Sequence, residues 1–286
     1  MANLKEIRNR ISSIGSTMQI TSAMKMVSAA KLKKAQDAIT AMRPYSSKLT
    51  ELLQNLSATL DSDAGGAYSK QREVSKVLLV VVTSNRGLCG GFNSSVIKET
   101  TQNIAANYQD VDVDLLTIGK KGNDILSKSY PVIDARNDVF DNLTFDYVAE
   151  VAEKIMKLYS DGTYDKIEII YNRFKNAATQ IPQVEQFLPI KPVEGDTNAS
   201  ADYIFEPSKE KIVLELIPKS LKTQLYKSVR DSFAAEHGAR MTAMHKATDN
   251  ATELRDELKL TYNKARQAAI TNEILEIVGG AEALKN

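Results

Sequence analysis

The residues best suited to bind a ligand lie in the glycine-rich run Ser84–Asn93 (SNRGLCGGFN), which follows the valine-rich segment Val74–Val82. A glycine-rich turn between a strand and a helix can hold a phosphate group with its backbone N–H groups. However, the run lacks the Gly-Lys-Ser/Thr ending of a P-loop, and Gly87, Gly90 and Gly91 do not follow the G-x-G-x-x-G spacing of a dinucleotide site. The pattern therefore favours a packed structural turn over a ligand site.

The other residue types that carry chemistry do not form a recognisable site. Cys89 is the only cysteine, and the two histidines, His237 and His245, lie eight residues apart without the carboxylate pattern of a metalloprotease helix. This inventory argues against a zinc site. We interpret the histidines as surface or interface residues, and Asp112 and Asp114, which alternate along a predicted strand, as water-facing. We therefore predict no catalytic, cofactor-binding or metal-binding residue.

The charge of the chain is unevenly distributed. Its 286 residues contain 37 Lys or Arg and 36 Asp or Glu, but the first sixty contain nine and three, and Lys31, Lys33 and Lys34 form a basic cluster. Such a segment indicates either an acidic partner, which could be nucleic acid, a membrane surface or an acidic protein, or a solvated helix face. The cluster lacks the interleaved aromatic residues of single-strand nucleic-acid binders.

Composition also limits the compartment. No apolar run approaches the roughly 18 residues that a transmembrane helix needs. The first residues lack a signal or transit pattern, and a single cysteine excludes an internal disulfide. We therefore expect a chain without a membrane span of its own, in a reducing compartment.

Glycine and proline are scarce towards both ends of the sequence and crowd its middle. Pro44 is the only such residue between positions 16 and 64, and Gly238 the only one between positions 219 and 278. Two helices far longer than the usual length of about 11–12 residues are therefore predicted to flank a compact insert. We assign residues 1–60 to the first helix, 74–207 to the insert and 208–286 to the last helix.

Apolar residues recur at steps of three and four along both predicted helices, which is the period of a coiled coil. In the first helix this seam consists of Leu4, Ile7, Ile11, Ile14, Met18 and Thr21, followed by Met24, Val27 and the small residues Ala23, Ala30, Ala35 and Ala38. In the last helix, with one doubled step of four, it consists of Met244, Ala247, Ala251, Leu254, Leu258, Tyr262, Ala265 and Ala269. The alanine-rich seams predict that the two helices pair closely as an antiparallel coiled coil, the alternative being two ordinary bundle helices.

Apolar residues also lie outside these seams. They are Ile20, Met26 and Ala29 in the first helix and Ile270, Ile274, Leu275, Ile277 and Val278 in the last. Exposed apolar surface on a helix pair indicates that other protein surrounds it. We expect the last helix to begin or kink at Pro218 and to end at Gly279-Gly280.

The insert alternates predicted strands and helices, which indicates right-handed crossovers and a mostly parallel sheet. The predicted strands are Val74–Val82, Val111–Ile118, Pro131–Ala135, Lys166–Asn172 and an edge strand at Gln183–Ile190. The predicted helices are Ser94–Tyr108, a short helix after Gly122, and Thr144–Tyr159. The fold class is therefore α+β overall: a long antiparallel coiled coil of the N- and C-terminal helices with an inserted, Rossmann-like α/β domain.

Three separated motifs resemble those of the gamma subunit of F-type, proton-translocating ATP synthases, and the resemblance covers nearly the whole chain. They are Ile20–Leu32 (ITSAMKMVSAAKL), Ser84–Asn93 (SNRGLCGGFN) and Tyr262–Glu273 (YNKARQAAITNE). The insert lacks the extra cysteine pair of the redox-regulated chloroplast type, so the resemblance is to the bacterial type.

The resemblance implies a rotor subunit that has no catalytic residue and no cofactor. In that family the helix pair threads a ring of three alpha and three beta subunits. The insert and the lower coil sit on the membrane-embedded c ring, with the epsilon subunit beside them, and one copy serves each complex. The resemblance also implies a peripheral location at the cytoplasmic face of the bacterial inner membrane, reached through the c ring, and no nucleic-acid partner.

The resemblance further implies contacts for individual residues. Those implied to contact the alpha/beta ring are Met24, Lys25, Arg240, Arg266, Gln267 and Thr271. In the family, the first two positions lie against an acidic lever loop of beta, and the other four hydrogen-bond to a catch loop of the ring. The residues implied to contact the c ring are Tyr203, Phe205 and Glu206. For each of them the alternative is a seam residue or a solvated one.

Two other functions stay open on the residues alone. A coiled-coil adaptor could bind nucleic acid or another acidic partner through Lys31–Lys34, which predicts salt-sensitive binding of DNA or RNA. A nucleotide-dependent enzyme could be built on the insert, which predicts that the isolated chain binds ATP or NAD.

Overall fold

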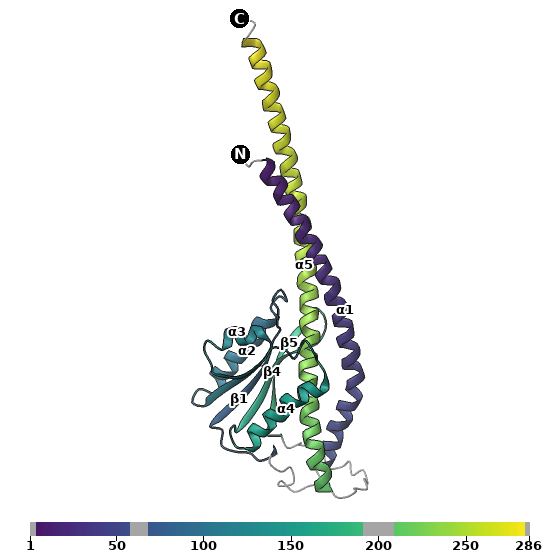
Figure 1. Ribbon diagram of the computed structural model, residues 1–286, viewed down its shortest axis with the longest axis vertical. Coiled ribbons are helices and arrows are strands. Elements are labelled where there is room, and N and C mark those ends of the chain that lie inside the picture. The colour runs from purple at the N-terminus through teal and green to yellow at the C-terminus, as the bar shows by residue number, and fades with distance from the viewer. Residues whose placement is uncertain (1–3, 58–67, 191–208, 284–286) are drawn as a thin grey trace. The chain divides into compact units, whose positions relative to one another are not determined.

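The computed structural model describes residues 4–57, 68–190 and 209–283. Their elements follow the order α1 (Leu4–Ser57), β1 (Lys76–Val82), α2 (Phe92–Asn107), β2 (Asp112–Ile118), α3 (Lys120–Leu126), β3 (Val132–Arg136), α4 (Phe145–Ser160), β4 (Lys166–Phe174), β5 (Gln180–Leu188) and α5 (Lys209–Ala283) (Figure 1). The chain divides into two compact units. Unit 1 consists of residues 1–27 and 241–286, and unit 2 consists of residues 28–240, so α1 and α5 each contribute to both.

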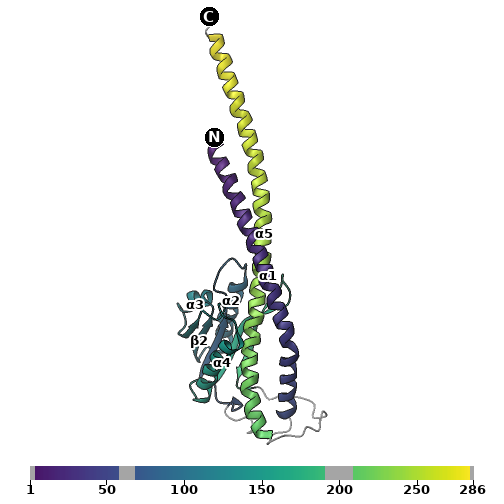
Figure 2. The same ribbon diagram turned by 45° about the vertical axis from the view of Figure 1, so that its right-hand side comes forward.

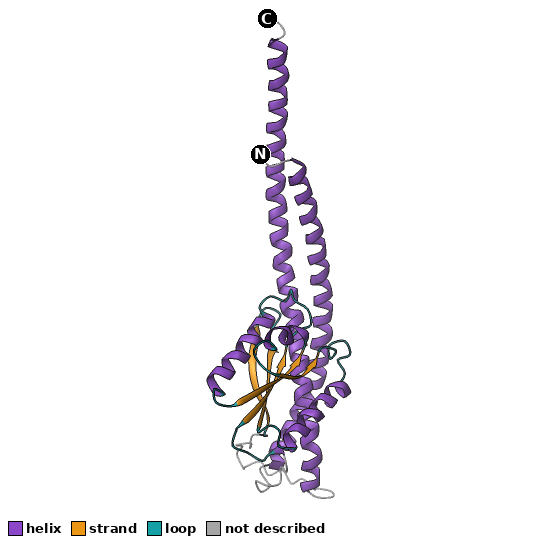
Figure 3. Cartoon of the chain, turned by 60° about the vertical axis from the view of Figure 1, so that its left-hand side comes forward, coloured by secondary structure: helices purple, strands orange, loops and turns teal. Residues whose placement is uncertain are grey.

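Unit 2 is built around a five-stranded sheet with the strand order β3-β2-β1-β4-β5 (Figure 3). β1 pairs in parallel with β2 and β4, β2 pairs in parallel with β3, and β5 runs antiparallel to β4 at the edge. All the residues from Val77 to Val82 in the central strand are fully buried. A continuous apolar run of this kind is typical of a strand covered on both faces. The predicted mostly parallel sheet with a C-terminal edge strand is confirmed.

Helices cover both faces of this sheet. On one face, Val96 of α2 and Leu126 of α3 pack in a core with alternate residues of β1. On the other face, Ile155 of α4 and Leu225 and Val229 of α5 join a larger core with β1 and β4. Fully burying one such side chain stabilises a fold by about 1.5–3 kcal/mol. The C-terminal helix is therefore a layer of the α/β insert itself.

Within unit 2, α1 lies beside α5 in all three views (Figures 1, 2 and 3). Among the side chains described in this part of α1, Ser28, Leu32, Ala35, Ile39 and Leu49 are buried. Ala35 is therefore a seam residue as predicted, but the predicted seam residue Ala30 is exposed. The heptad continues through Ser28 and Leu32 instead of Ala30. A small polar side chain such as that of Ser28 can occupy a seam position as readily as alanine.

In unit 1, residues 4–27 of α1 run antiparallel to the part of α5 that begins at Met241. Near the start of α1, Arg8 Nη2 donates to the hydroxyl of Tyr262 at 2.7 Å. Near residue 27, the hydroxyl oxygens of Thr21 and Thr248 lie 2.8 Å apart. Since the position in α5 falls as the position in α1 rises, the predicted antiparallel pairing is confirmed.

Both seams of unit 1 differ from the prediction in some positions. Ala23 and Val27 of α1 are exposed, and Leu254 of α5 is 47% exposed. In place of Leu254, Arg255 points towards α1, with Nη1 3.6 Å from Met18 Sδ. An arginine can pack its methylene stem while its charge stays in water. The doubled step of four disappears, because the half-buried or buried seam residues are Thr248, Ala251, Arg255, Leu258 and Tyr262.

The ends of α5 also differ from the prediction. The helix begins at Lys209 and runs through Pro218, and it continues through Gly279 and Gly280 to Ala283. An interior proline removes a backbone hydrogen bond, but Leu221, one turn further on, is buried in the sheet core and holds the helix there. Neither glycine has the positive φ of a helix-ending residue. The other predicted elements are present, with ends displaced by no more than three residues, and α3 contains Gly122 instead of following it.

Gly119 directly follows β2 at the carboxyl end of the sheet, where its backbone passes very close to the backbone of Thr83. Its φ is +101°, and a Cβ atom at this position would lie 2.2 Å from the carbonyl oxygen of Thr83. Thr83 N–H donates to Ile118 O at 2.8 Å, and Thr83 Oγ1 accepts from Gly122 N at 2.8 Å. The residues that follow β1 and β2 are thus locked together at a distance that only glycine permits.

We predict that Gly119→Ala lowers the free energy of unfolding by at least about 2 kcal/mol, because it adds a positive-φ penalty to a backbone clash. Urea-induced unfolding followed by circular dichroism measures this loss. Gly87→Ala is the matched control, since a Cβ at Gly87 meets no atom within 4 Å. A similar loss in both variants would contradict the role assigned to Gly119.

Candidate functional site

The carboxyl end of the sheet in unit 2 is where a ligand site would be expected. The chain moves from β1 to β2 on one side and later returns to β4 on the other side of β1. In open α/β sheets, ligands bind in the crevice at such a switch in strand order. The glycine-rich loop, residues 84–91, follows β1 directly and therefore lies at this crevice.

In this chain the loop is packed against α5. Cys89 and Phe92 form a small apolar cluster with Ala235 and Ala239 of the helix, and Phe174 packs against it. At Gly238, α5 approaches Ala177 and Phe174 of the insert closely. A Cβ at that position would lie 3.1 Å from Ala177 Cα and 3.3 Å from the Phe174 ring. The side of the loop that faces α5 is therefore filled by the chain itself.

Arg240 joins α5 to the loop by hydrogen bonds. Its Nη2 donates to the carbonyl oxygens of Arg86 at 2.9 Å and of Gly87 at 3.3 Å. Its Nη1 forms an ion pair with Glu236 one turn earlier, and both side chains are buried. Burial raises the pKa of Glu236, while the charge of Arg240 opposes that rise. This buried pair fits a structural contact, since its two groups are already occupied by the chain.

Hydrogen bonds to other residues of the insert also hold the loop. Ser84 N–H donates to Asn93 Oδ1 at 2.9 Å, and Asn85 Nδ2 donates to Asn137 O at 2.6 Å. Lys120 N–H donates to Asn85 Oδ1 at 3.0 Å, so Asn85 connects the residues after β1, β2 and β3. Cys89 is 1% exposed, and burial raises the pKa of its thiol. The thiol form is a poor nucleophile, which argues against chemistry at this cysteine.

The two histidines lie in different surroundings. His245 is exposed, as predicted, and its Nδ1 lies 3.3 Å from Asp249 Oδ2. His237 is only 5% exposed, and its ring meets the edge of Phe233 with centroids 4.5 Å apart. Neither ring nitrogen of His237 has a hydrogen-bond partner in the described part of the chain. Within that part, no group of three His, Cys, Asp or Glu side chains could hold a metal ion.

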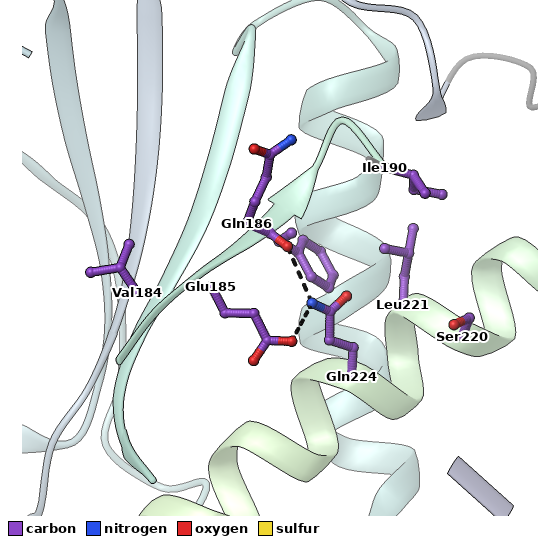
Figure 4. Close-up of a pocket in the computed structure, with 8 residues that line it drawn as sticks. Val184, Glu185, Gln186, Ile190, Ser220, Leu221 and Gln224 are labelled. Atoms are coloured by element: carbon purple, nitrogen blue, oxygen red, sulfur yellow. Dashed lines mark hydrogen bonds between the residues drawn. The ribbon is translucent and has the colours of Figure 1, made fainter. Parts of the chain in front are cut away.

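One pocket lies between the edge strand β5 and α5, with a volume of about 320 Å³ (Figure 4). Gln224 crosses it, and its Nε2 donates to Glu185 Oε1 at 2.8 Å and to Gln186 O at 3.2 Å. Glu185 also accepts a hydrogen bond from the Tyr171 hydroxyl at 2.9 Å. The pocket was not predicted, because it depends on how α5 crosses β5. Its polar groups are bonded to one another, so it resembles a packing gap more than a binding site.

The predicted partner-contact residues of unit 1 lie on two helices. Met24 and Lys25 are half-buried on α1. Arg266, Gln267 and Thr271 are exposed on α5, where Thr271 Oγ1 donates to Gln267 O at 2.9 Å. Gln267 and Thr271 are four residues apart and so share one helix face. Their contacts with other subunits stay predictions, as do those of Arg240. Tyr203, Phe205 and Glu206 lie outside the described residues.

The last part of α5 carries several large apolar side chains that are exposed. In Figures 1 and 2, α5 continues past the start of α1. Every residue from Arg266 to Ala281 is exposed. The exposed apolar face consists of Ile270, Ile274, Leu275, Ile277 and Val278, which are 48–66% exposed. Apolar side chains exposed along successive turns of a helix are unusual on a chain that has no partner. None of the described helices is long and apolar enough to cross a membrane.

The fold and this exposed face define a helix pair with an α/β insert, one helix of which extends beyond its partner with exposed apolar side chains. A sequence profile of the family described as ATP synthase matches residues 3–284. The chain is 74% identical to the ATP synthase gamma chain of Flavobacterium psychrophilum over the full length of both. It is 64% identical to that of Christiangramia forsetii over 99% of each. The chain belongs to the ATP synthase gamma chain family.

Solved structures with a similar fold come from the same kind of assembly. The central stalk and c ring of Tetrahymena thermophila mitochondrial ATP synthase contains a chain with a TM-score of 0.60 and 26% identity. That match covers 80% of the present chain and 99% of the other. The rotor of Euglena gracilis mitochondrial ATP synthase contains one with a TM-score of 0.69 and 22% identity, covering 93% and 98%. The second similarity concerns the fold alone.

We predict that His237 makes the stability of the chain depend on pH. Burial, with the nearby charges of Arg240 and Lys31, lowers the pKa of His237 from 6.5 to about 3. Between these values the unfolded chain takes up a proton that the folded chain does not. The free energy of unfolding should therefore fall by about 1.4 kcal/mol for each pH unit below 6.5.

Urea unfolding at several pH values between 5 and 7 measures this slope. His237→Phe should remove it, whereas His245→Phe, at the exposed histidine, should keep it. An unchanged slope in His237→Phe would show that His237 is not the source of the pH dependence.

Proposed function

We propose that this chain is the rotating central-stalk subunit of an F-type ATP synthase. It couples ion-driven rotation of the membrane c ring to conformational change at the beta subunits, where ATP is made or hydrolysed. The observation that carries this proposal is the exposed apolar face of α5, residues 270–278, in a chain of the gamma family. Such a face needs enclosing protein, and a ring of alpha and beta subunits supplies it.

The physical requirement of this mechanism is differential contact. A shaft shifts a beta subunit between open and closed states only if it contacts the two states with different free energy. Moving such an equilibrium from almost entirely one state to almost entirely the other takes roughly 5.5 kcal/mol. Two unlike helix surfaces, α1 with Met24 and Lys25 and α5 with its apolar face, give a shaft whose sides differ.

The contacts proposed for individual residues follow from this mechanism. Met24 and Lys25 meet the acidic lever loop of a beta subunit. Arg266, Gln267 and Thr271 hydrogen-bond to the catch loop of the ring, and the exposure of all three side chains suits that role. Arg240 is proposed to contact the same loop as the family resemblance implies, although its guanidinium already donates to Arg86 O and Gly87 O and pairs with Glu236 inside the chain. The c ring contacts fall to Tyr203, Phe205 and Glu206.

The chain itself is proposed to be non-catalytic. In the part that the structure describes, residues of α5 pack against one side of the glycine-rich loop, at the edge of the sheet where a doubly wound fold would bind a nucleotide. One copy serves each complex, with alpha, beta, epsilon and the c ring as partners and without nucleic acid. The complex places the chain at the cytoplasmic face of the bacterial inner membrane, as a peripheral subunit held by the c ring.

Co-purification tests the proposed function directly. An affinity-tagged chain expressed from its own locus should bring down alpha and beta in equal amounts, each in excess over the tagged chain, together with epsilon. A tagged chain recovered without alpha and beta would rule the rotor function out.

We predict that Met24→Lys lowers the number of ions pumped per ATP hydrolysed while the complex still assembles. A new positive charge beside an acidic loop adds about 1–4 kcal/mol of attraction, depending on solvent exposure, and overstabilises one angular state. Inverted membrane vesicles allow ATP hydrolysis and acidification to be measured together. Met24→Leu is the control, because it keeps the apolar volume without the charge. Unchanged pumping per ATP in Met24→Lys would count against this contact.

A further inference from the structure

The contact between the glycine-rich loop and α5 lies at a distinctive place along the helix. Arg240 is the last residue of α5 that belongs to unit 2, and Met241 is the first that belongs to unit 1. The hydrogen bonds from Arg240 to Arg86 O and Gly87 O join residues more than 150 positions apart. They therefore attach the insert to α5 at the last residue of the helix that belongs to unit 2.

The chemistry of this attachment depends on an arginine. A planar guanidinium can donate to several acceptors in fixed directions, whereas a lysine ammonium cannot reproduce that fork. Here one terminal nitrogen serves the two loop carbonyls and the other serves Glu236. Because Glu236 is buried as well, the pair has little solvent to compete for its hydrogen bonds.

The loop presents its carbonyls in a rigid form. Leu88 has a φ of 63° and Gly90 a φ of 59°, so the chain turns sharply just after Gly87. The bonds of Ser84 and Asn85 fix the start of the loop, and Phe92 N–H donates to Cys89 O at 3.3 Å near its end. A non-glycine residue with positive φ persists only where its surroundings hold it.

Small residues bring the helix close to the insert beside this attachment. Ala235 and Ala239 are buried against Cys89 and Phe92, and Gly238 lies against Ala177. A helix surface of small side chains leaves little room for the two parts to shift. The junction thus combines close apolar packing with a buried, multiply bonded charge.

We propose that Arg240, Glu236 and the loop 84–91 form a clamp that transmits turning force between the α/β insert and α5. This inference rests on the proposed rotor function and assigns a mechanical role to the SNRGLCGG motif, which provides no ligand site. Arg240 and Glu236 act as positioning residues, because they hold the insert at a fixed angle on the helix that turns. The clamp contact is made inside the chain and does not depend on a partner subunit.

Arg240→Lys in the full chain tests the clamp. Loss of the forked hydrogen bonds of a buried charge should speed amide hydrogen–deuterium exchange in residues 84–93 by about tenfold or more. Arg230→Lys is the matched control. Arg230 Nη2 also donates from α5 to an insert carbonyl, Leu143 O at 2.9 Å, but away from the loop. Exchange in residues 84–93 that is unchanged by Arg240→Lys would overturn the clamp.

Pumping per ATP hydrolysed in membrane vesicles tests the transmission of force. Arg240→Lys should lower it, and Arg230→Lys should leave it unchanged. Glu236→Gln, which removes the counter-charge at a position with no assigned partner contact, should lower it in the same direction. This second variant separates the clamp from a contact of Arg240 with the ring, and it serves if Arg240→Lys does not assemble. Faster loop exchange with normal pumping in Glu236→Gln would overturn the force-transmitting role.

The two measurements also separate this inference from the proposed function. Hydrogen exchange reads the clamp in the chain alone, whereas co-purification with alpha and beta reads the rotor function. A chain that fails to co-purify but shows the exchange result retains the clamp and loses the rotor. If the chain co-purifies with alpha and beta, but amide exchange in residues 84–93 is the same in Arg240→Lys and Arg230→Lys, the rotor function stands and the clamp does not.

Discussion

The burial of α5 against the sheet is the constraint on which the rest of the structure depends. Leu221, Leu225 and Val229 lie in the same core as β1 and β4, while Thr248 and Tyr262 of the same helix contact α1 in unit 1. Helices of this length, 75 residues, are stabilised mainly by tertiary packing and only weakly by propensity. Packing of successive stretches against two different surfaces explains how one helix accommodates Pro218 and serves both units.

The same burial decides what the α/β insert can do. A doubly wound sheet usually leaves a crevice at its carboxyl end, and here Arg240, Ala235 and Ala239 occupy the side next to the loop. The polar groups gathered there, including Ser84, Asn93 and the loop carbonyls, bond to one another and to Arg240. The insert has a doubly wound, mostly parallel sheet, and the polar groups beside its glycine-rich loop serve internal attachment.

Much of the fold could be predicted because its signals are local. The period of three and four marks Ile7, Ile14 and Thr21, and the valine run of β1 marks a strand covered on both faces. The predictions that are wrong rest on the type of a single residue. The apolar period predicts Leu254 in the seam, where the structure has Arg255, and Gly279 predicts a helix end although glycine only permits that conformation. The prediction of His237 as a surface or interface residue is wrong, since nothing near it in sequence reveals its burial beside Phe233.

The sequence by itself determined the two long helices, the parallel strands, the exposed apolar face near the C-terminus and the family to which the chain belongs. These features depend on residues a few positions apart or on contiguous motifs. Only the tertiary structure decided that α5 forms a layer of the insert, that Arg240 meets the loop at Arg86 and Gly87, and that His237 is buried. Such contacts join residues up to 154 positions apart, and they depend on the path of the whole chain, which local spacing does not encode.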